Sequence, residues 1–178
     1  MDVLTAAQRQ LNMARVRGRD TKPEWQVRRD LHRAGFRYRL HIRALPGRPD
    51  LALPRHRTVI FVHGCFWHGH SCRAANLPAT RTDFWRAKID GNRARDVAST
   101  KALIQSGWRV FTVWECALRG RARQPLGVLV ERLTAWLRSG ELRGELAALD
   151  HGAGFPDRGE GDRAARLPPT ADTEYEAP

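Results

Sequence analysis

The sequence contains few cysteines, few lysines and no long apolar segment. Three cysteines occur in 178 residues, an odd number that does not fit a disulfide framework. No run approaches the roughly 20 apolar residues that a membrane-spanning helix needs, and residues 1–12 lack the apolar core of a signal peptide. The sequence therefore predicts neither a membrane protein nor an exported one, and leaves metal binding or free thiols as uses for the cysteines.

Arginine supplies almost all of the positive charge, with 28 of the 31 basic residues. The net charge is +12, and residues 151–178 contain six acidic but only three basic side chains, so residues 1–150 carry a net charge of +15. This excess favours a polyanionic partner, and the lack of a basic amphipathic helix favours nucleic acid over a membrane surface. An arginine-rich genome would give the same composition without such a partner.

The length fits one domain with a single sizeable core. Hydrophobic residues make up 42% of the chain and include six tryptophans, which is enough material to fill that core. Residues 151–178 are rich in glycine, proline and charged residues and poor in aliphatic ones. We therefore predict a folded domain over residues 1–150 and a disordered C-terminal tail over residues 151–178.

Residues 21–35 have the pattern of a capped helix. Thr21 is a good N-cap residue, Glu24 follows at the capping-box position, and Gly35 is a typical helix end. Apolar residues recur between them at helical spacing.

Apolar periodicity predicts the remaining elements. A hairpin is expected where four residues separate two strand segments. The order of helix, strands, helix, strand and helix predicts an α/β fold with a mixed central sheet flanked by helices. The predicted elements are strands at 36–40, 58–63 and 108–114, a turn leading into a short strand within 46–54, a loop at 64–72, and helices at 83–106 and 126–140.

The three cysteines and one histidine form a candidate zinc site. Cys65, His70 and Cys72 lie within eight residues, and Cys116 follows the predicted strand at 108–114. Three thiolates and one imidazole make a complete tetrahedral structural zinc site. The alternative is that Cys116 is a buried thiol and His70 a surface residue. Spacing alone also leaves open whether His68 or His70 is the histidine ligand.

Asp50, which follows a proline and precedes a hairpin and a buried strand, resembles the first acidic residue of a PD-(D/E)XK nuclease core. In that core a second acid also binds Mg²⁺ and a lysine contacts the phosphate, but Phe61 and His63 stand at those places here. A Mg²⁺ site could still form with the backbone carbonyl of Val62, because Mg²⁺ needs few protein ligands. Asp50 could instead be an ordinary turn aspartate.

Histidine is the residue type that can take a proton from attacking water near neutral pH, and both His63 and His68 are candidates for that role. His63 could instead be a strand-end residue with satisfied hydrogen bonds. Glu24 is accounted for by the capping box. Asn92 and Asp96 fall on the apolar face of a predicted helix, and the residues alone favour a buried hydrogen-bonded pair there over a functional site.

Two aromatic pairs accompany the candidate metal loop. Phe66 and Trp67 lie inside the loop, and Phe84 and Trp85 begin the next helix. Large apolar side chains in a metal-held loop are usually core residues, and the residues alone favour that interpretation. In a basic protein they could instead be wedges inserted between base pairs.

Taken together, these segments resemble the very-short-patch repair (Vsr) family of DNA mismatch endonucleases. The resemblance runs in one register over roughly residues 5–138. The segments that carry it are NMARVRGRDTKPE (12–24), PGRPD (46–50), FVHGCFWHGHSC (61–72), PATRTDFW (78–85), NRARD (92–96) and GWRVFTVWECALRG (107–120).

The resemblance implies a role for each candidate residue. It places the metal-binding aspartate at Asp50, the backbone-carbonyl ligand at Val62 and the catalytic histidines at His63 and His68. Glu24 matches a residue near the metal-bound waters, whereas Asp96 matches a recurrent residue whose role stays open. The implied structural zinc ligands are Cys65, His70, Cys72 and Cys116, and the implied DNA-intercalating residues are Phe66, Trp67 and Trp85.

The resemblance also implies the reaction, which is Mg²⁺-dependent nicking of double-stranded DNA on the 5′ side of the thymine in a T:G mismatch. Such mismatches arise when 5-methylcytosine deaminates, so a cytosine-5 DNA methyltransferase in the same cell is implied. A MutL-type mismatch-repair protein is an expected partner, and a cytoplasmic, nucleoid-associated location is expected.

Two alternatives compete with this interpretation. A different PD-(D/E)XK nuclease that cuts both strands would normally keep the second acid and the lysine, which are absent here. A zinc-stabilised DNA-binding protein without catalysis would have no use for Asp50, His63 and His68 together.

Overall fold

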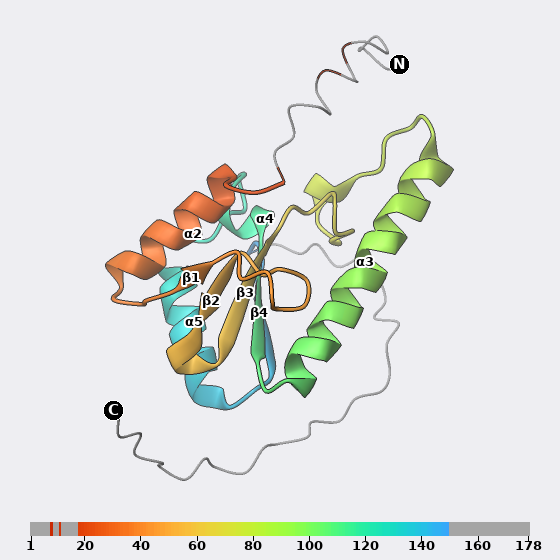
Figure 1. The fold of residues 1–178 in the computed structure, drawn as a ribbon. Helices are drawn as coiled ribbons and strands as arrows, with labels where there is room; N and C mark the ends of the chain where they lie inside the picture. Colours follow the sequence, from red (N-terminus) through yellow and green to blue (C-terminus); the bar gives the residue numbers. More distant parts are fainter. Residues whose placement is uncertain (1–7, 9–10, 12–17, 150–178) are drawn as a thin grey trace, which may run out of the picture.

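A five-stranded mixed sheet forms the centre of the structure, a computed structural model that describes residues 8, 11 and 18–149 (Figure 1). The antiparallel pairs are β1–β2 and β2–β3, whereas β4 runs parallel to both β3 and β5. The predicted hairpin and the mixed sheet are therefore confirmed. In their order across the sheet, the strands are β1 (Arg39–Leu40), β2 (Leu51–Leu53), β3 (Thr58–His63), β4 (Arg109–Trp114) and β5 (Arg143–Leu146).

Helices cover both faces of this sheet (Figure 1). One face packs against α2 (Lys22–Arg33) and α5 (Val128–Ser139), and the other against the long helix α3 (Thr82–Gln105). A single turn of helix, α4 (Glu115–Leu118), follows β4 directly. None of the helices that the structure describes is long and apolar enough to cross a membrane.

The strand residues alternate between the two faces, as the pleat of a strand requires. In β3, Ile60 packs with Leu31 of α2 and Leu133 of α5, whereas its neighbours Val59 and Phe61 pack on the side of α3. This alternation explains why 58–63 is a nearly continuous apolar run, because a strand buried on both faces has no solvent-facing positions.

The start of α2 has the predicted capping box. The Thr21 hydroxyl accepts a hydrogen bond from the Glu24 backbone N–H at 3.5 Å, and the Glu24 carboxylate accepts one from the Thr21 N–H at 3.3 Å. Pro23 lies in the first turn, where its missing N–H costs no helical hydrogen bond. The reciprocal bonds fix both the start of α2 and the direction of the Glu24 side chain.

Several sequence predictions were wrong in detail. The alternation predicted over 36–40 yields only the two-residue strand β1, although Phe36 and Tyr38 do pack against the core. Leu126 precedes α5 and is 93% exposed, and Trp136 takes a core position on that helix instead.

The predicted tail at 151–178 lies outside the described residues and stays a prediction.

The edge strand β5 was not predicted, because its sequence Arg-Gly-Glu-Leu contains only one core residue. Leu146 is buried, whereas Arg143 and Glu145 are exposed. A side chain at Gly144 would meet the ring of Trp136 at 2.6 Å, so the strand needs glycine for α5 to pack this closely. The strand therefore owes its place to contacts that are distant in the sequence.

Candidate active site

A cleft of about 970 Å³ opens at the edge of the sheet where β3 and β4 end and β2 begins. Residues from the start of α2, the middle of α3 and the first turn of α4 complete its walls. Parallel strands place their carboxyl ends at one edge of a sheet, and the antiparallel β2 begins there, so residues far apart in the sequence meet. The predicted site residues that line the cleft are Glu24, Asp50, Val62, His63, Trp67 and His68.

Asp50 lies just before β2 and opposite the end of β3. Its Oδ2 accepts a hydrogen bond from the backbone N–H of Val62 at 2.7 Å, and within the described part of the chain this is the only hydrogen bond recorded for its carboxylate. Burial raises the pKa of Asp50 to about 6, against the lowering effect of the Val62 N–H, and the nearby Glu24 charge raises it further. A partly desolvated carboxylate with a free oxygen is suited to bind a hard cation.

Glu24 is buried in the wall of the same cleft. Its carboxylate accepts hydrogen bonds from the Asp20 N–H at 2.9 Å, the Thr21 hydroxyl at 2.8 Å and the Arg28 guanidinium at 2.8 Å, in addition to the capping bond. Four donors thus hold the side chain in one orientation. The capping function and a place beside Asp50 are therefore compatible in one residue.

His63, His68 and Asp96 form a second group in the cleft. The two imidazole rings stack with their centroids 3.7 Å apart and their planes 5° from parallel. His68 Nδ1 lies 2.6 Å from Asp96 Oδ2. Because a carboxylate only accepts hydrogen bonds, this contact places a proton on Nδ1 and leaves Nε2 of a neutral His68 free to accept one.

His63 is held in its neutral form. Burial lowers its pKa to about 3, and the adjacent His68 contributes in the same direction. The ring also makes aromatic contacts with Phe61 at 5.4 Å and Trp114 at 5.4 Å between centroids. It therefore presents a fixed imidazole at the end of β3, next to the Val62 backbone.

The expectation of a hydrogen-bonded Asn92–Asp96 pair was wrong. No hydrogen bond joins these two residues. Asn92 donates to the backbone carbonyl of Trp67 at 2.7 Å, and Asp96 contacts His68. Both side chains therefore hold the loop 64–72 against α3. Their polar character on an otherwise apolar helix face was the signal, but only the fold shows what they contact.

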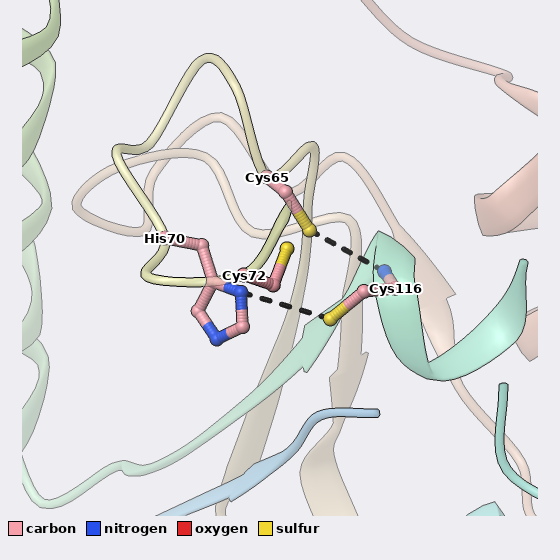
Figure 2. A group of neighbouring side chains, drawn as sticks. All are labelled: Cys65, His70, Cys72 and Cys116. Carbon is pink, nitrogen blue, oxygen red and sulfur yellow. Dashed lines mark hydrogen bonds between the residues drawn. The ribbon is translucent and has the colours of Figure 1, made fainter. Parts of the chain in front are cut away.

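The loop 64–72 also supplies most of a candidate metal centre. Figure 2 shows Cys65, His70 and Cys72 from the loop turned toward Cys116, which lies in the first turn of α4. One ligand atom from each residue lies within 4.8 Å of the others. The Cys116 N–H donates to Cys65 Sγ at 3.3 Å, and Cys116 Sγ lies 3.6 Å from His70 Nδ1.

This donor set fits a tetrahedral zinc ion. Burial raises the pKa of the thiols of Cys65 and Cys116, which favours their protonated form when no metal is bound. The ring of His70 stacks on Trp114 at 4.2 Å, which fixes its orientation. The geometry also separates the two histidines, because His70 faces the cysteines whereas His68 faces Asp96 and His63.

Phe66, Trp67 and Trp85 form an aromatic cluster beside the cleft. Phe66 contacts Trp67 and Trp85 with ring centroids 5.1 and 5.3 Å apart, and Trp67 and Trp85 are 6.1 Å apart. All three are partly exposed, and none belongs to a core cluster of the described residues. The interpretation that the residues alone favoured, burial in the core, is therefore wrong.

The loop 64–72 lies tight against α3, because a side chain at Gly69 would collide with Ile89 of that helix at 2.7 Å.

Comparison with known proteins connects this geometry to a family. Residues 1–74 match the family model described as DNA mismatch endonuclease Vsr. The chain is 46% identical over 136 residues to DNA mismatch endonuclease Vsr of Escherichia coli, a stretch that covers 76% of this chain and 87% of the relative. It is 49% identical over 132 residues to the Type II nicking enzyme V.XorIIP of Xanthomonas oryzae pv. oryzae, covering 74% and 93%. The chain belongs to the Vsr family of DNA mismatch endonucleases.

A third Vsr relative extends this range. The Type II nicking enzyme V.NmeAIP of Neisseria meningitidis serogroup A is 41% identical over 134 residues, which cover 74% of this chain and 96% of the relative. Membership makes this Vsr protein an endonuclease that acts on DNA, and it confirms the resemblance found in the sequence. A DNA-binding protein without catalysis is thereby excluded as an alternative.

The cleft of this Vsr protein also contains residues that sequence reasoning missed. Glu115 and Arg119 of the short α4 region form an ion pair at 2.9 Å, and Lys88 of α3 also lines the cleft. The Glu115–Arg119 pair could have been found in the sequence, because an acid and a base four residues apart directly after a predicted strand can form an ion pair on one helical turn. Arg28, one turn after Glu24, was also missed, because an arginine on a basic chain is usually a surface residue.

Proposed function

We propose that this endonuclease nicks double-stranded DNA on the 5′ side of the thymine in T:G mismatches, as the first step of very-short-patch repair. The main observation is that Asp50, His63, His68 and Asp96 line one cleft beside a partly exposed aromatic cluster. The members of this set come from the position just before β2, the end of β3, the loop 64–72 and α3. Such a combination suits hydrolysis of a phosphodiester at a distorted base-pair step.

In this proposal, Mg²⁺ is held by one oxygen of Asp50 and the backbone carbonyl of Val62. The fit rests on Asp50, whose carboxylate has a raised pKa and makes a single hydrogen bond within the described residues. A bound Mg²⁺ neutralises charge that develops on the phosphate in the transition state. Glu24 adds a fixed negative charge to the same wall of the cleft.

His68 is the proposed general base. Its Nε2 takes a proton from the attacking water, while Asp96 holds the ring through Nδ1 and stabilises the imidazolium that forms. His63 stacks on His68 and stays neutral, so it supports the phosphate or the attacking water without adding a second positive charge beside His68. This arrangement differs from a nuclease core in which a lysine contacts the phosphate.

A structural Zn²⁺ bound by Cys65, His70, Cys72 and Cys116 completes the proposal. Its ligands alternate along the loop with His68 and with the aromatic residues. The ion would tie the loop to the end of β4 and so fix His68 and Trp67 relative to the sheet. Zinc in this role supplies folding free energy and takes no part in the chemistry.

Mismatch selection is assigned to Phe66, Trp67 and Trp85. A T:G wobble pair stacks less well than a matched pair, so wedging a ring into that step costs less. The thymine of such a pair arises from deaminated 5-methylcytosine, which implies that the protein accompanies a cytosine-5 DNA methyltransferase. A MutL-type mismatch-repair protein is the proposed partner in later steps.

The decisive experiment measures nicking of a duplex labelled on both strands. We expect the wild type to cut only the thymine strand of a T:G duplex, only with Mg²⁺, and to leave the matched T:A duplex largely intact. Asp50→Asn should bind the mismatch but cut it at least about 100-fold more slowly, because the cation loses its only acidic ligand. Cleavage of both strands, or normal cutting by Asp50→Asn, would contradict the proposal.

A further inference from the structure

Arg28 is placed unusually for an arginine in so basic a protein. Among the charged residues that the structure describes, only Glu24 and Arg28 are fully buried, each with 3% of its surface exposed. Arg28 lies in α2, one helical turn after Glu24, and does not line the cleft. Burying an arginine is costly unless its charge is compensated, so its partners show what it does.

The guanidinium joins three partners from different parts of the chain. Its two terminal nitrogens contact Asp20 Oδ1 at 2.6 Å and Glu24 Oε2 at 2.8 Å, and one of them also lies 3.2 Å from His41 Nε2. Arginine has only donors, so a hydrogen bond in this contact requires a neutral His41 whose Nε2 accepts. The remaining nitrogen, Nε, is buried without a hydrogen-bond partner among the described residues, so all three contacts are made by the terminal nitrogens.

Two of the partners of Arg28, Asp20 and His41, belong to the segment before α2 and to the segment 41–50. These two segments form the wall of the cleft around Asp50, the proposed Mg²⁺ ligand. Asp20 belongs to the segment before α2, which carries Gly18 and Thr21 into the cleft wall. His41 begins the segment that runs from β1 to Asp50. Both Asp20 (φ 56°) and His41 (φ 49°) have a left-handed backbone, which non-glycine residues adopt only when the surroundings hold them.

Arg28 also belongs electrostatically to the site. Its charge lowers the pKa of Asp50, in opposition to Glu24, which raises it. The guanidinium therefore lies close enough to act as a fixed counter-charge to Glu24 and Asp50, which line the cleft.

We infer that Arg28 is a positioning residue for the endonuclease reaction: its buried guanidinium ties the segment before α2 to the 41–50 segment and locks Glu24 beside Asp50. It touches neither the DNA nor the cation. The inference rests on the proposed assignment of this cleft as the nuclease site. Groups behind metal ligands act in this way in many sites, and their loss typically reduces activity by about 10- to 100-fold.

The test compares Arg28→Met with Arg29→Met, a matched change at the next residue, whose side chain is 61% exposed. Nicking of the T:G duplex is measured in a single turnover at saturating protein and Mg²⁺, DNA affinity is measured separately, and the folded fraction is measured by circular dichroism. We expect Arg28→Met to lower the nicking rate per folded molecule by about 10- to 100-fold with little change in DNA affinity. Arg28→Lys should recover part of the rate, because it restores the charge but not the planar fork. Arg29→Met should cut at the wild-type rate.

A nicking rate per folded molecule close to wild type in Arg28→Met would overturn the inference, because a merely structural arginine would change only the melting temperature. If Arg28→Met does not fold, His41→Phe tests the same tie, since it removes the acceptor and leaves the Arg28–Glu24 pair. We expect it to cut more slowly, and wild-type cutting would overturn the inference. Normal cutting by Asp50→Asn would instead refute the proposed function, whatever the Arg28 variants do.

Discussion

At the residue scale, the contact between His68 and Asp96 sets which ring nitrogen is available for chemistry. The carboxylate accepts a hydrogen bond from Nδ1–H, so in a neutral His68, which lines the cleft, the opposite nitrogen is the acceptor. A histidine without this partner would divide its population between two tautomers and several ring orientations. The contact therefore raises the fraction of molecules that are ready to act.

Asp96→Asn should lower the nicking rate by about 100-fold while mismatch affinity stays unchanged. The amide can still contact Nδ1, but it neither selects the useful tautomer nor stabilises the imidazolium. Single-turnover nicking and equilibrium binding on one labelled duplex measure the two effects separately. Asp90→Asn, an exposed aspartate on the same helix, is the control. Equal cutting by both variants would remove Asp96 from the mechanism.

Trp67→Ala should weaken binding to the T:G duplex by about 1–3 kcal/mol, the value of one lost base stack. Affinity for the matched duplex should hold, because it comes from arginine–phosphate contacts. The melting temperature should also hold, since Trp67 lies outside the core. Trp25→Ala is the matched control for affinity, because Trp25 is 61% exposed and lies outside the aromatic cluster, with its ring 5.5 Å from the Arg28 guanidinium. Equal losses on matched and mismatched DNA would return Trp67 to a structural role.

At the element scale, the ends of β3 and β4 are the part of the fold on which the site depends. His63 pairs with Trp114 at the last position of the parallel register, and the loop after β3 meets the turn after β4 through Cys65 and Cys116. Any force that joins these two ends also fixes the position of the proposed catalytic histidines. The proposed zinc ion would be such a force.

Cys116→Ser should therefore destabilise the whole fold. A ligand present at 1,000 times its Kd stabilises a folded protein by about 4 kcal/mol, and losing that amount lowers Tm by roughly 8–16 °C in a chain of this size. Thermal unfolding and metal analysis of protein purified without added zinc measure both effects. Ser71→Ala, in the same loop, should leave both unchanged. A metal-free wild type that melts like the zinc-loaded protein would exclude the zinc site.

Elements whose pattern is local were predictable from the sequence, and elements set by distant contacts were not. The capping residues of α2 and the apolar run of β3 identify themselves within a few positions. In contrast, β5 exists because Gly144 lets Trp136 approach, and the Arg28 network exists because three segments meet. Likewise, spacing alone could not separate His68 from His70, because their partners lie on α3 and after β4.

At the scale of the whole molecule, charge is distributed unevenly along the chain. Residues 1–150 carry the positive excess, and residues 151–178 carry a net charge of −3. Contacts with phosphates release counterions, so binding to any duplex should weaken steeply as salt concentration rises. The acidic segment can contribute nothing favourable to that interaction.

A protein that ends at residue 150 should therefore nick T:G duplexes at the full rate. Its affinity for matched DNA should be equal or slightly higher, because three net negative charges are gone. Nicking rate and affinity over a salt series are the measurements. A loss of an order of magnitude in cutting a short duplex would give residues 151–178 a function in catalysis.

The loop 64–72 has a consequence for how this protein can vary. Surface loops normally tolerate insertions and deletions better than the elements they connect. Here, neighbouring residues serve different tasks, with Cys65 and His70 facing α4, Trp67 in the aromatic cluster and His68 against Asp96. One extra residue anywhere between them would shift each side chain after it into its neighbour's place. Insertions or deletions that change which DNA sequence is preferred must therefore occur in other segments around the cleft. We expect the loop 64–72 to keep its nine residues in any protein that keeps these four tasks.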